Sequence, residues 1–81
     1  MGGRFPIAIY RDVVRVARKL GFLLYRSGKG DHEVWRRPSD GRYTTIPNWG
    51  SRALKRKTLK SILEDFGITP DEFIKLRKGK R

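Results

Sequence analysis

The sequence predicts a single α+β domain in which helices cover one face of a three-stranded antiparallel sheet. Its 81 residues suffice for one domain. Apolar residues recur at helical spacing near both ends, and the middle alternates strand-like runs with turns rich in Gly, Pro and Asp. We expect the domain to span residues 8–76, between a flexible arm at residues 1–7 and a frayed basic tail at residues 77–81.

The first helix is predicted from about Ile9 to Leu20. Apolar residues share one face, basic residues take most other positions, and Gly21 can adopt the positive φ that ends many helices. Pro6 disfavours an earlier start. The apolar positions are Val13, Val16, Ala17 and Leu20.

Three strands are predicted in the middle of the chain, at Phe22–Arg26, His32–Arg37 and Arg42–Ile46. The turn sequences Gly28–Gly30 and Pro38–Gly41 join them, and such short connections favour an antiparallel meander. The predicted order is an α-β-β-β-α sandwich, followed by a short extra helix at the C-terminal end. This order resembles the architecture of the double-stranded RNA-binding domain.

The second strand does not divide into a polar and an apolar face. Strict alternation would place His32, Val34 and Arg36 on one face and Glu33, Trp35 and Arg37 on the other. Neither set is purely apolar, so the register stays open, with a bulge at the turn as one explanation. We expect Trp35 to lie in the core.

Two more helices follow a basic linker at Asn48–Lys57. The first is predicted from Thr58 to Phe66 and ends at Gly67, because apolar residues again share one face. Those residues are Leu59, Ile62, Leu63 and Phe66.

The last helix has complete start signals. Thr69 is the expected N-cap, Pro70 the first helical residue, and Glu72 the partner of Thr69 in a capping box. Ile68 and Phe73 can form a hydrophobic staple around this start.

The charge of the chain is one-sided. Lysine and arginine number 20 against 8 aspartates and glutamates, a formal net charge of +12 at pH 7. Such an excess attracts polyanions, so we expect a nucleic-acid partner, with a merely solvated charged surface as the alternative. There is no cysteine and one histidine, which leaves little for a disulfide or a zinc site. The apolar runs are too short for a membrane span, and we expect a cytoplasmic protein.

His32 is the single histidine, and it follows the turn Gly28-Lys29-Gly30 directly. Histidine has an unperturbed pKa of about 6.5, which suits it to exchange protons near neutral pH. The residues alone leave two readings open, an acid–base group or a polar residue that supports the turn.

The segment GFLLYRSGKGDHEVWRRP, residues 21–38, resembles the core of the HicA (YcfA-like) family, the mRNA interferase toxins of toxin–antitoxin pairs. Shared features are the GF-led strand, the His after a turn, the apolar pair and the basic strand end. Residues 43–76 continue the resemblance through a strand ending in Pro, a basic linker, a T-L-x-x-I-L helix and a closing E-F-x-x-L. This chain has Asp31 where the family has Ser, and Trp49 where many members have a second His.

The resemblance implies an endoribonuclease that cleaves mRNA or other single-stranded RNA without a metal or cofactor. His32 would be its general acid and base, either in both roles or with a Lys, Tyr or water in the second. The implied protein partner is a HicB-type antitoxin. The main alternative is an RNA-binding module with the same fold and no catalysis, and a third is a basic protein-interaction domain.

Residues that would bind RNA surround these motifs. Lys29 and Gly30 can bring an ammonium group and a backbone N–H to a phosphate, and Trp49 can stack on a base. Arginine suits bidentate phosphate contacts. The remaining candidates are Arg26, Arg36, Arg37, Arg52, Lys55, Arg56 and Lys57.

Overall fold

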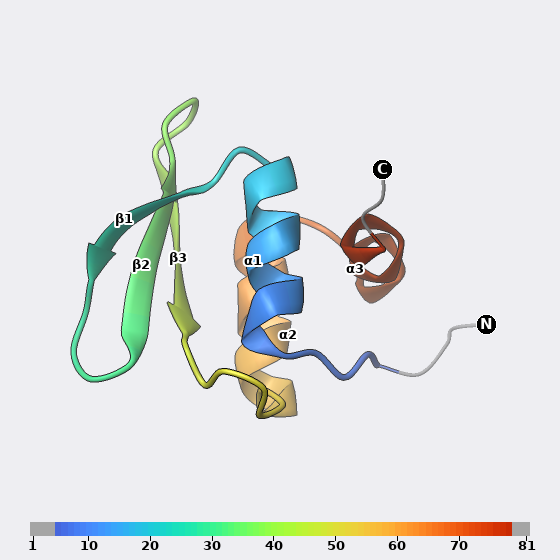
Figure 1. Ribbon diagram of the computed structural model, residues 1–81. Helices are drawn as coiled ribbons and strands as arrows, with labels where there is room; N and C mark the ends of the chain where they lie inside the picture. Colours follow the sequence, from blue (N-terminus) through green and yellow to red (C-terminus); the bar gives the residue numbers. More distant parts are fainter. Residues whose placement is uncertain (1–4, 79–81) are drawn as a thin grey trace.

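The computed structural model describes residues 5–78 and confirms the α+β prediction. Its three strands form an antiparallel sheet in the order β1-β2-β3. Helices α1 and α2 cover one face of this sheet, and α3 lies behind them on the side away from the sheet (Figure 1). The elements are α1 (Tyr10–Lys19), β1 (Leu23–Ser27), β2 (His32–Arg37), β3 (Arg42–Pro47), α2 (Arg56–Phe66) and α3 (Pro70–Arg77).

The core lies between the sheet and the helices. The apolar faces predicted for the first two helices are buried in it, except for the partly buried Leu20, together with Phe22, Trp35 and Ile46 from the strand region. Helix α1 is one residue shorter at each end than expected, since Ile9 and Leu20 are its capping residues. None of the helices between residues 5 and 78 is long and apolar enough to cross a membrane.

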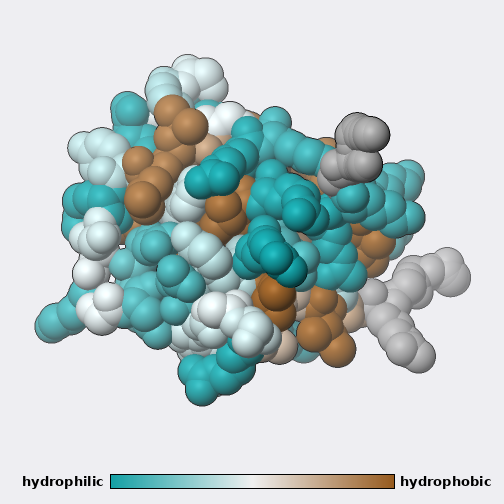
Figure 2. Space-filling view, viewed as in Figure 1, coloured by the Kyte–Doolittle hydropathy of each residue, from teal (hydrophilic) through white to brown (hydrophobic). Residues whose placement is uncertain are grey.

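Strand β1 stands apart from this core. All five of its residues are exposed, and it pairs only with β2. Figure 2 shows hydrophobic side chains gathered over this part of the sheet, where Leu23 and Leu24 are each more than half exposed. Strand β1 therefore leaves apolar side chains exposed at this edge of the sheet.

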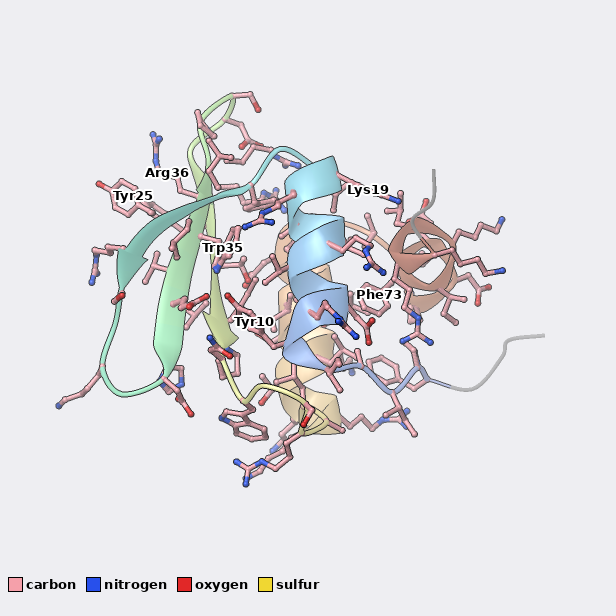
Figure 3. The ribbon with its side chains drawn as sticks, viewed as in Figure 1. Tyr10, Lys19, Tyr25, Trp35, Arg36 and Phe73 are labelled. Carbon is pink, nitrogen blue, oxygen red and sulfur yellow. The ribbon has the colours of Figure 1, made fainter. Side chains whose placement is uncertain are left out.

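Trp35 fixes the register of the central strand. Its side chain is only 2% exposed and points from β2 toward α1 (Figure 3). Its indole Nε1 donates to Glu33 Oε1 at 3.2 Å, and the Tyr10 hydroxyl donates to the same oxygen at 2.6 Å. Burial, followed by the hydrogen bond to Glu33, raises the pKa of Tyr10 to about 12. Glu33 thus lies on the helix side, where it accepts hydrogen bonds from Tyr10 and Trp35.

The irregularity in the sheet is not at the turn, where the sequence suggested a bulge. Leu24 pairs with Trp35 and Arg26 with Val34, so Tyr25 is the extra residue of a bulge within β1. A bulge changes which way side chains point on the affected strand. Here it leaves both Tyr25 and Arg26 on the face away from the helices, because Val34 and the aromatic neighbours of Tyr25 lie there.

Helix α2 begins at Arg56, two residues before the predicted start at Thr58. The Leu59 amide already donates to the Lys55 carbonyl at 2.9 Å, which makes Lys55 the N-cap residue. Arg56 and Lys57 therefore belong to the helix and not to the linker. The end at Gly67 is as predicted, with a φ of +77°.

The start of α3 is confirmed. Glu72 N donates to Thr69 Oγ1 at 3.1 Å, and Thr69 N donates to Glu72 Oε1 at 2.8 Å. Its Phe73 side chain is fully buried. Arg77, which the sequence placed in the tail, is the last residue of α3, and residues 79–81 of that tail lie outside the described part.

Basic side chains hold α3 against the rest of the domain. Lys19 Nζ donates to the Leu76 carbonyl at 2.7 Å and Arg15 to the Arg77 carbonyl at 3.1 Å. The Arg77 guanidinium donates in turn to the Ile7 carbonyl at 2.6 Å. The end of the predicted arm is thus in contact with α3, while residues 1–4 lie outside the described part.

The turn between β2 and β3 is closed by an ion pair. Arg37 Nε and Nη2 donate to the two carboxylate oxygens of Asp40 at 3.0 and 2.9 Å. The Arg42 amide donates to Asp40 as well. These hydrogen bonds, that of Arg37 first, lower the pKa of Asp40 from its usual 3.8 to about 2.

We expect the Asp40→Asn variant to lose a pH-dependent part of the stability. Because the pKa of Asp40 is lower in the folded protein, its contribution is complete above about pH 4 and is lost as the pH falls toward 2. Urea unfolding midpoints, measured between pH 2 and 6, should differ between wild type and variant at pH 5 and converge near pH 2. A difference that stays constant over this range would contradict the assignment.

Candidate functional site

His32 is the first residue of β2 and lies next to the turn that closes the β1–β2 hairpin. Its side chain is 55% exposed. Ring atom Nδ1 is 3.1 Å from the Lys29 carbonyl oxygen. A carbonyl only accepts, so this contact is a hydrogen bond when Nδ1 carries the proton. The neutral ring then has an unprotonated Nε2, which is a base.

The turn before His32 forms hydrogen bonds with the backbone of His32. Gly28 N donates to the His32 carbonyl at 2.7 Å, and His32 N donates to the Lys29 carbonyl at 3.1 Å. The Lys29 carbonyl thus contacts both the backbone and the ring of His32. A Cβ added at Gly28 would lie 3.2 Å from the His32 carbonyl oxygen. The backbone of the hairpin turn therefore orients the imidazole. The Gly28 amide donates its hydrogen bond within this turn.

Asp31 is close to the imidazole but does not orient it. Its Oδ1 lies 3.9 Å from His32 Nδ1, and both side chains are about half exposed. That separation is longer than a hydrogen bond. The backbone of Asp31 instead accepts from the Asn48 amide at 2.8 Å, which ties the turn to the end of β3.

A groove of about 760 Å³ runs from His32 along the edge strand β3 to one face of α2. Hydroxyl groups dominate its polar lining. Thr44 Oγ1 donates to Asp65 Oδ2 at 2.9 Å, which links β3 to α2 across the inner wall. The lining residues are Asp31, His32, Tyr43, Thr44, Thr45, Pro47, Trp49, Lys57, Thr58, Ser61, Ile62 and Asp65.

Three of the predicted RNA-binding residues gather near His32 at this groove. Trp49 and Lys57 line it. Arg52 stacks its guanidinium over the Trp49 ring at 4.3 Å, a distance typical of a cation–π contact. Trp49 is partly buried and packs against the core, so it presents one part of its ring to the groove.

The other predicted RNA-binding residues are not part of the groove lining. Lys29 and Gly30 are in the exposed hairpin turn, and Arg26 and Arg36 are on the open face of the sheet. Lys55 is exposed at the start of α2. The sequence therefore grouped residues that belong to several surfaces.

Two of the predicted RNA-binding arginines have partners within the domain. The Arg37 guanidinium binds Asp40, donates to the Leu20 carbonyl at 3.2 Å and covers the Phe22 ring at 4.8 Å. Arg56 stacks over Phe5 at 4.7 Å. We leave both out of the proposed RNA surface for this reason.

Sequence reasoning did not find the far wall of the groove. Thr58, Ser61 and Asp65 are spaced three and four residues apart on α2, so they share one helix face. Tyr43 and Thr45 of β3 line the groove as well. The helical spacing was visible in the sequence, but a polar stripe on a helix usually faces solvent alone.

No group of three or more His, Cys, Asp or Glu residues is placed to hold a metal ion within residues 5–78.

A protein-family comparison places these features in context. The family described as HicA toxin of bacterial toxin–antitoxin matches residues 10–68, well over half of the chain. The chain belongs to the HicA toxin family. The match ends at Ile68, so it does not include the Pro70–Leu76 segment that the sequence resemblance included. A comparison with curated proteins gives no match.

Membership in the HicA family makes this chain a toxin of the toxin–antitoxin class. Toxins of this family are generally ribonucleases, and the class implies an antitoxin partner and an RNA substrate. The formal net charge of +12 over the whole chain is consistent with a polyanionic substrate.

We expect the Gly28→Ala variant to disturb His32 without unfolding the domain. The added Cβ meets the His32 carbonyl, so the 2.7 Å bond from the amide of residue 28 must lengthen. Loss of about 1 kcal/mol in that bond gives roughly fivefold faster amide exchange at residue 28. NMR should also detect shifted His32 ring signals.

Gly30→Asn is the matched control for this prediction. Gly30 has a φ of +61°, which Asn tolerates, and nothing lies within 4 Å of an added Cβ. This control should leave the His32 ring signals in place. Equal effects of the two substitutions would show that the contact at Gly28 does not orient the ring.

Proposed function

We propose that this chain is an mRNA interferase, a metal-independent endoribonuclease that cleaves single-stranded RNA with His32 as its general base. One observation carries the proposal: the exposed imidazole lies at the end of the groove with Nδ1 against the Lys29 carbonyl. This contact leaves Nε2 free for proton transfer. The family membership and the net charge of +12 support RNA as the substrate.

In the proposed reaction, Nε2 of His32 removes the proton from a ribose 2′-hydroxyl. The 2′-oxygen forms a bond to the adjacent phosphorus, and the bond from that phosphorus to the 5′-oxygen of the next nucleotide breaks. The products are a 2′,3′-cyclic phosphate and, after protonation, a 5′-hydroxyl. A positioned histidine typically contributes about 10²–10⁴-fold to such a proton transfer.

The leaving 5′-oxygen needs a proton from a second source. Attacking and leaving oxygens lie roughly in line on opposite sides of the phosphorus. A single fixed imidazole does not face both oxygens, and the chain has no second histidine. The groove offers the Tyr43 hydroxyl, the Lys57 ammonium and water as donors. Lys57 also suits electrostatic stabilisation of the phosphate.

We further propose that a HicB-type antitoxin binds over this groove and blocks access to His32 in the cytoplasm. An acidic partner surface would be attracted by the same positive field as RNA. This part of the proposal rests on the family membership.

The test is cleavage of single-stranded RNA by purified protein in the presence of EDTA. Wild type should cut, and His32→Ala should be about 10²–10⁴-fold slower because the base is gone. His32→Gln should lose activity to a similar extent, since an amide keeps polar contacts but does not titrate.

Asp31→Asn is the control, because the Asp31 carboxylate makes no hydrogen bond to the imidazole. It should retain most of the activity. Cleavage that survives in both His32 variants would refute His32 as the catalytic group. Binding of RNA without cleavage by wild type would favour the non-catalytic RNA-binding module.

A further inference from the structure

The open face of the sheet carries two exposed tyrosines with an arginine between them. Tyr25 and Tyr43 are 55% and 50% exposed, and their ring centroids are 5.7 Å apart at an interplanar angle of 73°. The Arg36 guanidinium lies 5.8 Å from the Tyr25 ring and 5.9 Å from the Tyr43 ring. Figure 3 shows Tyr25 and Arg36 on the side of the sheet away from Trp35 and the helices.

The fold produces this arrangement from three strands. Arg36 pairs with Tyr43 across β2 and β3, and the bulge in β1 brings Tyr25 to the same face. Neither tyrosine is needed to complete the core, since the helices cover only the opposite face. Exposed aromatic rings beside an arginine are a recurrent feature of surfaces that bind single-stranded nucleic acids.

The same face leads to His32. His32, Val34 and Arg36 alternate along β2, so their side chains share one side of the strand. Arg36 lies four positions after His32 along β2, which corresponds to about 13 Å. An RNA strand with its cleaved phosphate at His32 therefore passes over the tyrosines if it follows β2.

Charge favours RNA as the occupant of this face. In the described chain, the strand residues that point away from the helices include Arg26 and Arg36 and no acidic residue, because Glu33 points inward. A phosphate backbone meets positive charge on this path, and the rings offer stacking surfaces to its bases.

We propose that Tyr25, Arg36 and Tyr43 form a stacking platform that binds bases of single-stranded RNA next to the cleavage site. The proposal deepens the proposed ribonuclease function, on which it rests. The rings hold the bases by stacking and Arg36 contributes cation–π and phosphate contacts. The platform thus sets the position of the RNA relative to His32 through its rings, a role that does not depend on the Tyr43 hydroxyl.

Binding is measured by fluorescence anisotropy with a labelled single-stranded oligoribonucleotide, in a His32→Ala background that prevents cleavage. Tyr25→Ala and Tyr43→Ala should each weaken binding about fivefold to a hundredfold. Tyr25→Phe and Tyr43→Phe keep the rings and should bind like the parent. Leu24→Ala is the matched control, because Leu24 is equally exposed on β1 and pairs with the inward-facing Trp35.

An oligonucleotide with abasic sites provides a second arm. It should bind the parent more weakly than the normal RNA does, and the Tyr→Ala variants should discriminate little between the two ligands. Such non-additivity identifies base stacking as the lost interaction. Equal affinity of the parent for both ligands would overturn the platform.

Cleavage by the otherwise wild-type protein separates this proposal from the catalytic one. His32-dependent cleavage together with unchanged RNA affinity in both Tyr→Ala variants refutes the platform and leaves the nuclease intact. Ring-dependent RNA binding without any cleavage supports the platform and refutes the nuclease. Loss of antitoxin binding with unchanged RNA affinity would identify a protein-docking face and overturn the platform.

Discussion

The burial of Trp35 is the constraint on which the rest of the structure depends. Side chains alternate along a strand, so a shift by one residue would move every side chain of β2 to the other face. Trp35 excludes that shift, because its ring fills the core and its Nε1 needs the Glu33 carboxylate that also binds Tyr10. With Trp35 inward, His32 and Arg36 must point outward. The packing of one aromatic side chain thus determines which side chains of β2 face away from the helices.

The positive charges of this chain serve two purposes that the net charge alone does not separate. Arg15, Lys19 and Arg77 donate to backbone carbonyls and hold α3 and the N-terminal segment in place. Arg37 closes a turn through Asp40. These groups neutralise local partial charges and carboxylates inside the fold. Other cations, such as Arg26 on the open sheet face and Lys57 in the groove, are exposed to solvent.

Local signals in the sequence predicted much of this arrangement. Turn residues and helical spacing gave the element order, the capping box of Thr69 placed the start of α3, and the single histidine drew attention to the hairpin. The features that were missed depend on contacts between distant segments. Helix α2 starts without a capping side chain, so nothing in the sequence marks Lys55 as its N-cap. The bulge at Tyr25 is a property of strand pairing, and the groove combines β3 with α2.

The exposure of β1 has a consequence for the lifetime of the oriented imidazole. Segments with few buried contacts open locally at a much lower free energy than the whole domain unfolds. Strand β1 buries none of its residues and pairs with β2 alone, whereas the helices and β3 hold the core. The Lys29 carbonyl that orients His32 belongs to the turn that closes this hairpin. The equilibrium between open and closed hairpin therefore sets an upper limit on the fraction of folded molecules in which the Lys29 carbonyl orients the His32 ring.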